Sequence, residues 1–349
     1  MANNRIFYAS QAVVLTPMLQ EANGWTEQAV CVPRGLQSVG ITTNFALEQV
    51  FQLGQLELYD NIEDVPEVQV TLNKVIDGTL PLYLMCMGGG AAGSGKELAS
   101  LVNNRVNFRL QIYNDSNSAA TGTAAQYVNA TGMYLSSVSY TFPVDGNATE
   151  DVTLVGNNKF WNTSAKGGDA AAILPAALGS GTAVSIARRY KVIPSACTLP
   201  TGAGGFPASS HIQSISVSTD MGREAINELG SMAPYFRFAT FPLEVTSEFE
   251  IIAISGDQMG ADDFLGSAAA CTTVYKNLTD KAIVVKVCGT GSGDFLQLDL
   301  GTKNKLTSVN YTGGDAGGGN ATITYSFQTF NKLVVHASGT FAAVPSISG

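Results

Sequence analysis

LQSVGITTN, residues Leu36–Asn44, recurs 176 residues later as IQSISVSTD, residues Ile212–Asp220. The offset holds without a gap as far as Pro66 and Pro242, and eight of these 31 positions are identical, where average composition would give roughly two. The identical pairs beyond the opening stretch are Glu48/Glu224, Leu53/Leu229, Gly54/Gly230, Tyr59/Tyr235 and Pro66/Pro242. Self-similarity of this kind indicates a duplicated structural unit.

Two further matches follow in the same order. Ser137–Thr141 corresponds to Ser308–Thr312 at an offset of 171, and Asn147–Thr149 corresponds to Asn320–Thr322 at an offset of 173. Offsets that drift by a few residues are what insertions and deletions in loops produce. We therefore expect two tandem domains, at 1–165 and 166–349, the second beginning with a connecting segment at 166–210 that is rich in small residues.

Each copy shows the alternation of apolar and polar residues that is typical of half-buried antiparallel strands. The first strand alternates from Val39 to Thr43, and a second one alternates from Val68 to Leu72. Further strands are expected at 106–113, 134–142 and 151–155, and in the second copy at 182–193, 245–251, 281–288, 295–300, 306–311 and 321–327. Lys96–Val102 is the best helix candidate. The pattern predicts a mainly β fold.

The composition excludes several classes of protein. Charged residues make up 13% of the chain, about half of the roughly 25% that is usual. The net charge is −9 without a block of Lys or Arg, so we do not expect a surface that grips nucleic acid. No run approaches the ~20 apolar residues of a membrane helix, and a signal-peptide pattern is missing. Five scattered cysteines without a CxxC pair indicate a chain made in a reducing cytoplasm.

Three patterns in the sequence are typical of catalytic or ligand-binding sites, but in this chain each favours a structural interpretation. Gly90–Glu97 has the G-x-x-x-x-G-K spacing of a phosphate-binding loop, but Glu97 stands where Ser or Thr would hold magnesium. The only histidines, His211 and His336, have no nucleophile motif nearby, and no His/Cys spacing fits zinc. We expect no catalytic residue, no metal, no cofactor and no enzyme activity.

The third pattern is the crowding of acidic residues in Glu57–Glu67. A calcium loop or a catalytic carboxylate pair is the alternative to a solvated or subunit-facing loop, but the D-x-[DN]-x-[DN]-G pattern of a calcium loop is missing. The corresponding segment of the second copy, Ala233–Leu243, is almost uncharged. Copies that share a length and differ in charge favour a common shape over a common active site.

Three stretches of the first copy are distinctive, namely Gly35–Ile41, Asn61–Pro66 and the run YTFPVDGNATED at Tyr140–Asp151. They resemble tail-tube proteins of long-tailed bacteriophages. The resemblance covers most of the first copy and, through the repeat, the outline of the second. It implies two tandem tail-tube-like β-sandwich or half-barrel domains, each with a flanking short helix and a long loop between two strands.

In that family six units commonly close into a ring around a 24-stranded barrel, and stacked rings form the channel for DNA. With two units in one chain, the resemblance implies three chains per ring, a pseudo-hexamer with a charge of three times −9, or −27. The long loops would be Asn44–Pro66 and Asp220–Pro242. Their residues would reach the next ring, namely Glu48, Leu53, Gly54, Tyr59, Pro66, Glu224, Leu229, Gly230, Tyr235 and Pro242. An acidic lumen would let DNA slide.

The expected partners are further copies of the chain, the sheath, baseplate and tail-terminator proteins, and DNA in transient, non-specific passage through the lumen, with no membrane. The expected location is the virion tail, assembled in the host cytoplasm. One alternative is another β-rich virion part, such as a tail terminator, baseplate or capsid decoration protein. A carbohydrate-active or binding β-sandwich is a second alternative, but the only tryptophans are the scattered Trp25 and Trp161.

Overall fold

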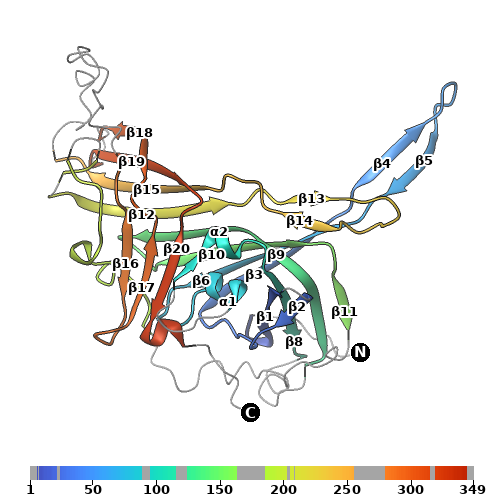
Figure 1. Ribbon diagram of the computed structural model, residues 1–349, viewed down its shortest axis with the longest axis horizontal. Coiled ribbons are helices and arrows are strands. Elements are labelled where there is room, and N and C mark those ends of the chain that lie inside the picture. Colours follow the sequence, from blue (N-terminus) through green and yellow to red (C-terminus); the bar gives the residue numbers. More distant parts are fainter. Residues whose placement is uncertain are drawn as a thin grey trace.

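The computed structural model is a mainly β protein of antiparallel sheets with short helices, which confirms the expected fold class (Figure 1). It describes residues 6, 8–21, 24–88, 95–114, 124–162, 185–202, 205–207, 209–254, 280–314 and 319–343. The helices in this part are α1 (Leu82–Met87), α2 (Leu98–Leu101) and the 3-10 turns Tyr8–Ser10, Pro194–Ala196 and Gly339–Ala342. None of the described helices has the length and apolar character needed to cross a membrane.

The largest sheet has twelve strands, and eight of them follow one another in a single antiparallel row. The first half of the chain supplies, in spatial order, β3 (Leu36–Asn44), β6 (Glu67–Val75), β10 (Thr149–Gly156) and β9 (Gln126–Pro143). The second half continues the row with β12 (His211–Asp220), β15 (Glu244–Ile252), β19 (Thr322–Phe330) and β18 (Lys305–Thr312). Both halves use the same order, so the row is one four-stranded arrangement placed twice, side by side.

The irregularities of the row repeat as well. The β3–β6 ladder shifts register between Leu36 and Ser38, and the β12–β15 ladder shifts between Ile212 and Ser214, the aligned positions of the repeat. The β9–β10 and β18–β19 ladders also each contain one shift. Because bulges are specific features of a sheet, equivalent bulges are what duplication of one unit would produce. The boundary expected at residue 165 lies outside the described residues and stays a prediction.

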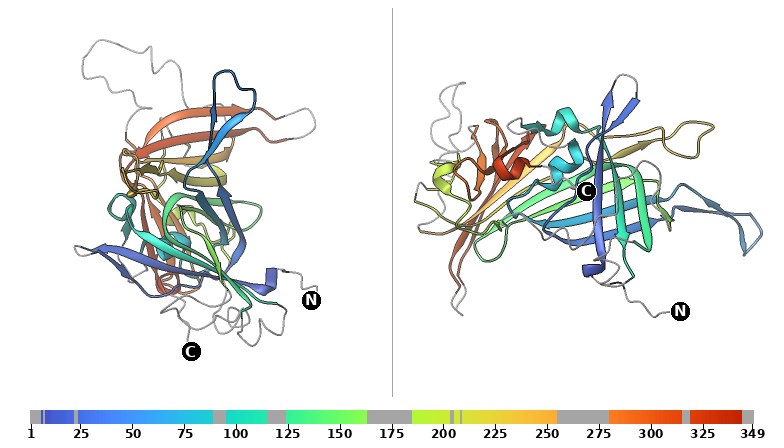
Figure 2. Two further views of the ribbon diagram at one scale, coloured as in Figure 1. Left: turned by 90° about the vertical axis from the view of Figure 1, so that its right-hand side faces the viewer. Right: turned by 90° about the horizontal axis from the view of Figure 1, so that it is seen from below.

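Strand β9 is long enough to belong to two parts of the sheet. Its C-terminal half pairs with β10 and β12, and its N-terminal half pairs with β8 (Arg105–Ile112) and β11 (Phe160–Asn162). The sheet continues from β8 to β1 (Gln11–Glu21) and β2 (Gly24–Glu27). Between the halves Gly132 adopts a φ of 65°, and its N–H donates to the Asn107 Oδ1 at 2.9 Å. The strands of the first half curl around their core (Figure 2).

A smaller sheet covers the second half of the row. Its strands lie in the order β16 (Val284–Cys288), β17 (Phe295–Asp299), β20 (Val334–Ser338) and β7 (Lys96–Glu97). Buried residues of this sheet and of the row, such as Val285, Leu298, Phe249 and Tyr325, belong to one hydrophobic core that runs through both halves. Since β7 comes from the first half of the chain and pairs with β20, the halves are joined in both sheets.

Helix α1 is buried completely, and a buried carboxylate holds its first turn. Glu150 accepts hydrogen bonds from the backbone N–H groups of Leu82 at 2.6 Å and Tyr83 at 2.9 Å, and from the Tyr140 hydroxyl at 2.9 Å. The first N–H groups of a helix have no partner within the helix, so Glu150 satisfies them. Burial raises the pKa of Glu150, while these hydrogen bonds oppose the shift. The group therefore has a structural role.

Residues 82–87, the apolar run before the glycine loop, form α1, so the strand–loop–helix context of a phosphate loop is missing. Two local expectations were wrong in part. The helix expected at Lys96–Val102 begins with β7, and α2 covers only its centre. Of the strand expected at 182–193, the described part from Ser185 contains only the single bridge Val192↔Val287.

The two expected long loops are β-hairpins. The first consists of β4 (Leu47–Phe51) and β5 (Leu58–Glu63), and the second of β13 (Glu224–Ile226) and β14 (Phe236–Phe238). Gly54 and Gly230, an identical pair of the repeat, both have a φ of 88° at the turns. Glycine adopts this left-handed conformation without strain, which explains why both copies hold glycine there.

Candidate assembly surfaces

The two halves of the row meet at an internal seam between β9 and β12. These strands pair antiparallel from Ser214↔Pro143 to Asp220↔Ser137. Tyr140 and Val217 lie directly opposite each other in this ladder, and both have 0% exposure. The seam is thus a fully packed contact between the last strand of one four-stranded arrangement and the first strand of the next.

The row ends in two open edges. Among the described strands, β3 pairs only with β6, and β18 pairs only with β19. Tyr311 of β18 occupies the position that Tyr140 occupies in β9, yet it is 51% exposed where Tyr140 is buried. An open edge presents backbone N–H and C=O groups that can pair with another chain. Both edges are therefore candidates for contacts between copies.

One face of the row packs on the core, and the opposite face is polar. Small hydroxyl side chains line this polar face, for example Ser214, Ser216 and Ser218 of β12, which alternate with buried residues. The acidic residues on it are Glu67, Asp151, Asp220, Glu244, Glu248 and Glu250. Within the eight strands the face has one Lys or Arg side chain, Lys305, whose ammonium lies 2.6 Å from the Asp280 carboxylate. Such a face repels polyanions.

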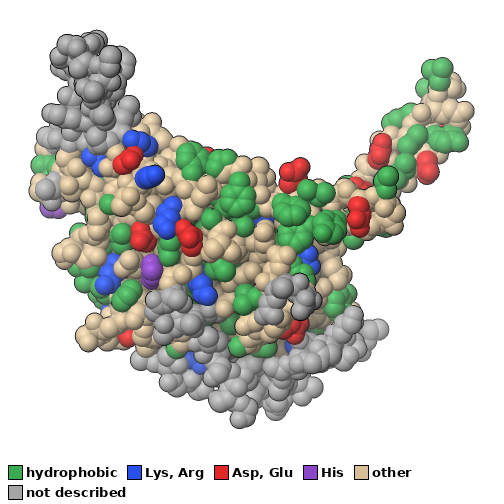
Figure 3. Space-filling view, in the orientation of Figure 1, with side chains coloured by type: hydrophobic (Ala, Val, Ile, Leu, Met, Phe, Trp, Pro, Cys, Tyr) green, Lys and Arg blue, Asp and Glu red, His purple; other side chains and the backbone are tan. Residues whose placement is uncertain are grey.

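The first hairpin, which we call arm 1 (Leu47–Glu63), projects away from the body of the protein (Figure 1). Its large apolar side chains are exposed and gather along the arm (Figure 3), namely Leu47, Phe51, Leu53, Leu56, Leu58, Tyr59 and Ile62. Exposed apolar surface of this kind is typical of sites that bind another molecule. Of the residues predicted for inter-ring contact, Glu48, Leu53, Gly54 and Tyr59 lie on arm 1, and Pro66 lies at its base.

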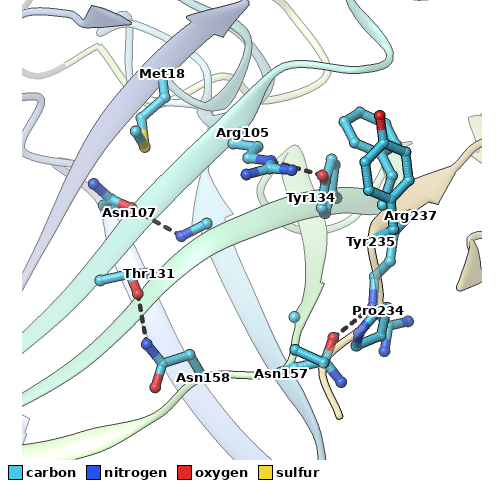
Figure 4. A pocket seen from close by; sticks show the side chains of 14 residues that line it. Met18, Arg105, Asn107, Thr131, Tyr134, Asn157, Asn158, Pro234, Tyr235 and Arg237 are labelled. Atoms are coloured by element: carbon cyan, nitrogen blue, oxygen red, sulfur yellow. Dashed lines mark hydrogen bonds between the residues drawn. The ribbon is translucent and has the colours of Figure 1, made fainter. Parts of the chain in front are cut away.

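The second hairpin, arm 2 (Glu224–Phe238), rests partly on the first half of the chain. The Arg237 guanidinium lies 3.0 Å from the Glu67 carboxylate and donates to the Asn157 Oδ1 at 3.0 Å. The Phe236 ring packs edge-on against Tyr134 at 5.3 Å between centroids. An open pocket lies beside these contacts (Figure 4).

Arg223 anchors the base of arm 2. Its guanidinium donates to the backbone carbonyl oxygens of Leu135 at 2.7 Å and Val102 at 2.5 Å. Burial lowers the pKa of Arg223 to about 10, which still leaves the group charged near neutral pH. Of the predicted contact residues, Glu224, Leu229, Gly230, Tyr235 and Pro242 lie on arm 2 or just after it, and all five are exposed.

The structure does not bring the predicted contact residues into one site, because they divide between two arms. Sequence reasoning missed Arg223 and Arg237, which hold arm 2 to the body. A signal for both was present in the repeat, where Leu47 aligns with Arg223 and Asn61 with Arg237. A cation that replaces an apolar or neutral residue at aligned positions indicates that one arm acquired a specific contact.

Among the residues considered for chemistry, His336 in β20 lies beside Gly95 and Lys96 of the glycine loop, whereas His211 lies in β12 of the other sheet. His211 is exposed at the start of β12, and His336 is half-buried in β20. The described residues contain no group of three His, Cys, Asp or Glu side chains that could hold a metal ion. Residues 89–94 of the glycine loop lie outside the described part of the chain. Burial raises the pKa of the Cys31 thiol to about 11.

Comparisons with known proteins add no family to this geometry: no protein-family model matches the chain, and no curated protein matches it. The chemistry of the surfaces is therefore the basis for a functional proposal. Two open sheet edges can pair with other strands, two arms offer apolar contact, and one broad face is polar and acidic.

Proposed function

We propose that this protein is the structural subunit of a bacteriophage tail tube, in which three chains form a ring and rings stack around a channel for DNA. One observation carries the proposal. A row of eight antiparallel strands has an acidic, hydroxyl-rich face and an open edge at each end. Such a row can form part of a closed β-barrel. Pairing of its edges with the edges of neighbouring copies would leave neither edge exposed.

The strand count supports three chains per ring. Three rows of eight strands make the 24 strands that the resemblance to tail-tube proteins implies. The polar face would line the channel, because the opposite face is buried against the core. Lysine and arginine hold DNA through its phosphates, and this face has a single lysine that is already paired with a carboxylate. DNA would therefore pass without being retained.

The assembly itself tests the proposal. We expect the purified chain to form long hollow tubes in negative-stain electron microscopy, with three chains per ring in cryo-electron microscopy. A tail terminator, baseplate or capsid decoration protein would stop at a single ring or remain unassembled. Rings of six chains, or the absence of tubes under all conditions of salt and concentration, would refute the proposal.

Reversal of charge on the polar face should make the tubes bind DNA. The double variant Glu248→Lys and Glu250→Lys changes each chain by +4 and a ring of three chains by +12. We expect its tubes to bind short DNA duplexes, with an affinity that falls steeply between about 50 and 200 mM salt, because lysine–phosphate contacts release counterions. Fluorescence anisotropy of a labelled duplex measures this.

The matched control is Glu248→Gln with Glu250→Gln, which removes the carboxylates without adding cations. We expect these tubes to bind DNA far more weakly than the lysine variant. If wild-type tubes bind DNA as tightly as the lysine variant does, the polar face is not the DNA-facing surface.

A further inference from the structure

The internal seam between β9 and β12 shows how one four-stranded arrangement joins the next. It is a seam between copies of a repeat, since β9 corresponds to β18 and β12 corresponds to β3. The backbone hydrogen bond from the Met221 N–H to the Ser136 carbonyl at 2.8 Å extends the ladder beyond the strands. The open edges of the row are therefore the two halves of the same type of seam, each without its partner.

We infer that β18 of one copy pairs antiparallel with β3 of a second copy of this chain, in the register of the internal seam. This inference rests on the proposed ring of copies and specifies its contact. The equivalences of the strands, offset 176 for β3/β12 and 171 for β9/β18, transfer the register pair by pair. The resulting pairs are Gly40↔Thr312, Ile41↔Tyr311, Thr42↔Asn310, Thr43↔Val309 and Asn44↔Ser308.

The side chains at the two edges fit this register. Ile41 meets Tyr311 where Val217 meets Tyr140 in the internal seam, so an apolar pair again lies on the core side. The half-exposed Tyr311 ring would be covered as Tyr140 is. On the polar face Thr42 meets Asn310 where Ser218 meets Ser139, so small polar side chains stay opposite each other. A shift by one residue would place polar side chains on the core side.

The Tyr311 contact differs from its internal counterpart in one respect. Tyr140 donates a hydrogen bond to Glu150, whereas the residue paired with Tyr311 in the neighbouring strand is Ile323. The Tyr311 ring therefore contributes apolar contact area at the seam between copies. The neighbouring strand offers Tyr311 no carboxylate in the place of Glu150.

The pairing is head-to-tail, since a β18 edge meets a β3 edge. Contacts of this kind lead to closed rings when the rotation between copies closes, and to open chains when it does not. A two-fold dimer would instead pair β3 with β3 or β18 with β18. These alternatives give different products in a cross-linking experiment.

Paired cysteines test the register. In Thr42→Cys with Asn310→Cys, both sites are exposed in the single chain and directly opposite each other between copies. The control Asn44→Cys with Thr312→Cys uses the same strands and face, but places the thiols four residues, or about 13 Å, out of register. Disulfides need Cα atoms within about 7 Å.

Assembled samples are oxidised and separated on non-reducing gels, with circular dichroism as a check that each variant is folded. We expect at least about tenfold more cross-linked product from Thr42→Cys/Asn310→Cys than from the control and from the wild type with its own cysteines. The series of cross-linked bands on the gel should end at three chains, because each chain has one cysteine at each edge of a closed ring.

Four outcomes overturn the inference. Stronger cross-linking of the control shows a different register, and equal dimer formation by Thr42→Cys or Asn310→Cys alone shows two-fold pairing. Tubes that form without any specific cross-link show that other surfaces join the copies, in which case the proposed function stands and the register fails. A folded chain that neither assembles nor cross-links refutes both.

Discussion

Tyr311→Asp is expected to abolish assembly while the single chain stays folded. In the seam between copies the ring of Tyr311 would be covered as Tyr140 is, so the aspartate would be an unpaired charge in a buried position. Such a charge costs about 3–5 kcal/mol. Since each factor of ten corresponds to about 1.4 kcal/mol, the concentration needed for assembly should rise about 100-fold or more. Sedimentation velocity and electron microscopy measure this.

The control is Tyr311→Phe, which keeps the apolar ring and should assemble like the wild type. The thermal unfolding midpoint of Tyr311→Asp should remain close to that of the wild-type monomer, because Tyr311 is 51% exposed in the single chain. Tubes of normal yield from Tyr311→Asp would show that the β18 edge does not lie in a contact between copies.

The double variant Leu53→Asp and Leu56→Asp is expected to leave rings that do not stack. Both leucines are fully exposed at the tip of arm 1, and we propose that they pack against the next ring. Burial of one leucine contributes about 1.5–3 kcal/mol, and the loss is repeated in each of the three chains of a ring. The length distribution of tubes in negative-stain images measures the effect.

Gln52→Asp with Gln55→Asp provides the matched control, since it adds the same charge to the same turn without removal of an apolar side chain. These residues are exposed as well, and tubes of this variant should be much longer than those of the leucine variant. If the leucine variant forms tubes of normal length, arm 1 does not hold the rings together.

The repeat predicted more of the fold than local propensity did. The stretches that open with Leu36 and Ile212 form equivalent strands with equivalent bulges, and the conserved pair Gly54/Gly230 marks both hairpin turns. Side-chain alternation is a local property of a strand, so it can be read from neighbouring residues. For that reason most expected strands were confirmed to within a few residues.

Local patterns left the structure open where tertiary contacts decide it. Residues 82–87 are continuously apolar, a pattern that suits a buried strand and a buried helix equally. They form a helix because Glu150, 68 residues beyond Leu82, supplies hydrogen-bond acceptors for the first turn. The anchors Arg223 and Arg237 of arm 2 were missed for the same reason, because their partners lie in the other half of the chain.

By itself the sequence determined the alternation of the strands, the repeat, the positions of the two long inserts and the shortage of basic residues. Only the tertiary structure decided that β9 pairs with β12, that β3 and β18 remain as edges, and which face of the row is acidic. The reason is physical. Alternation and charge belong to each segment, whereas the partner of a strand depends on packing between residues distant in the chain, and no local pattern encodes which strand lies beside which.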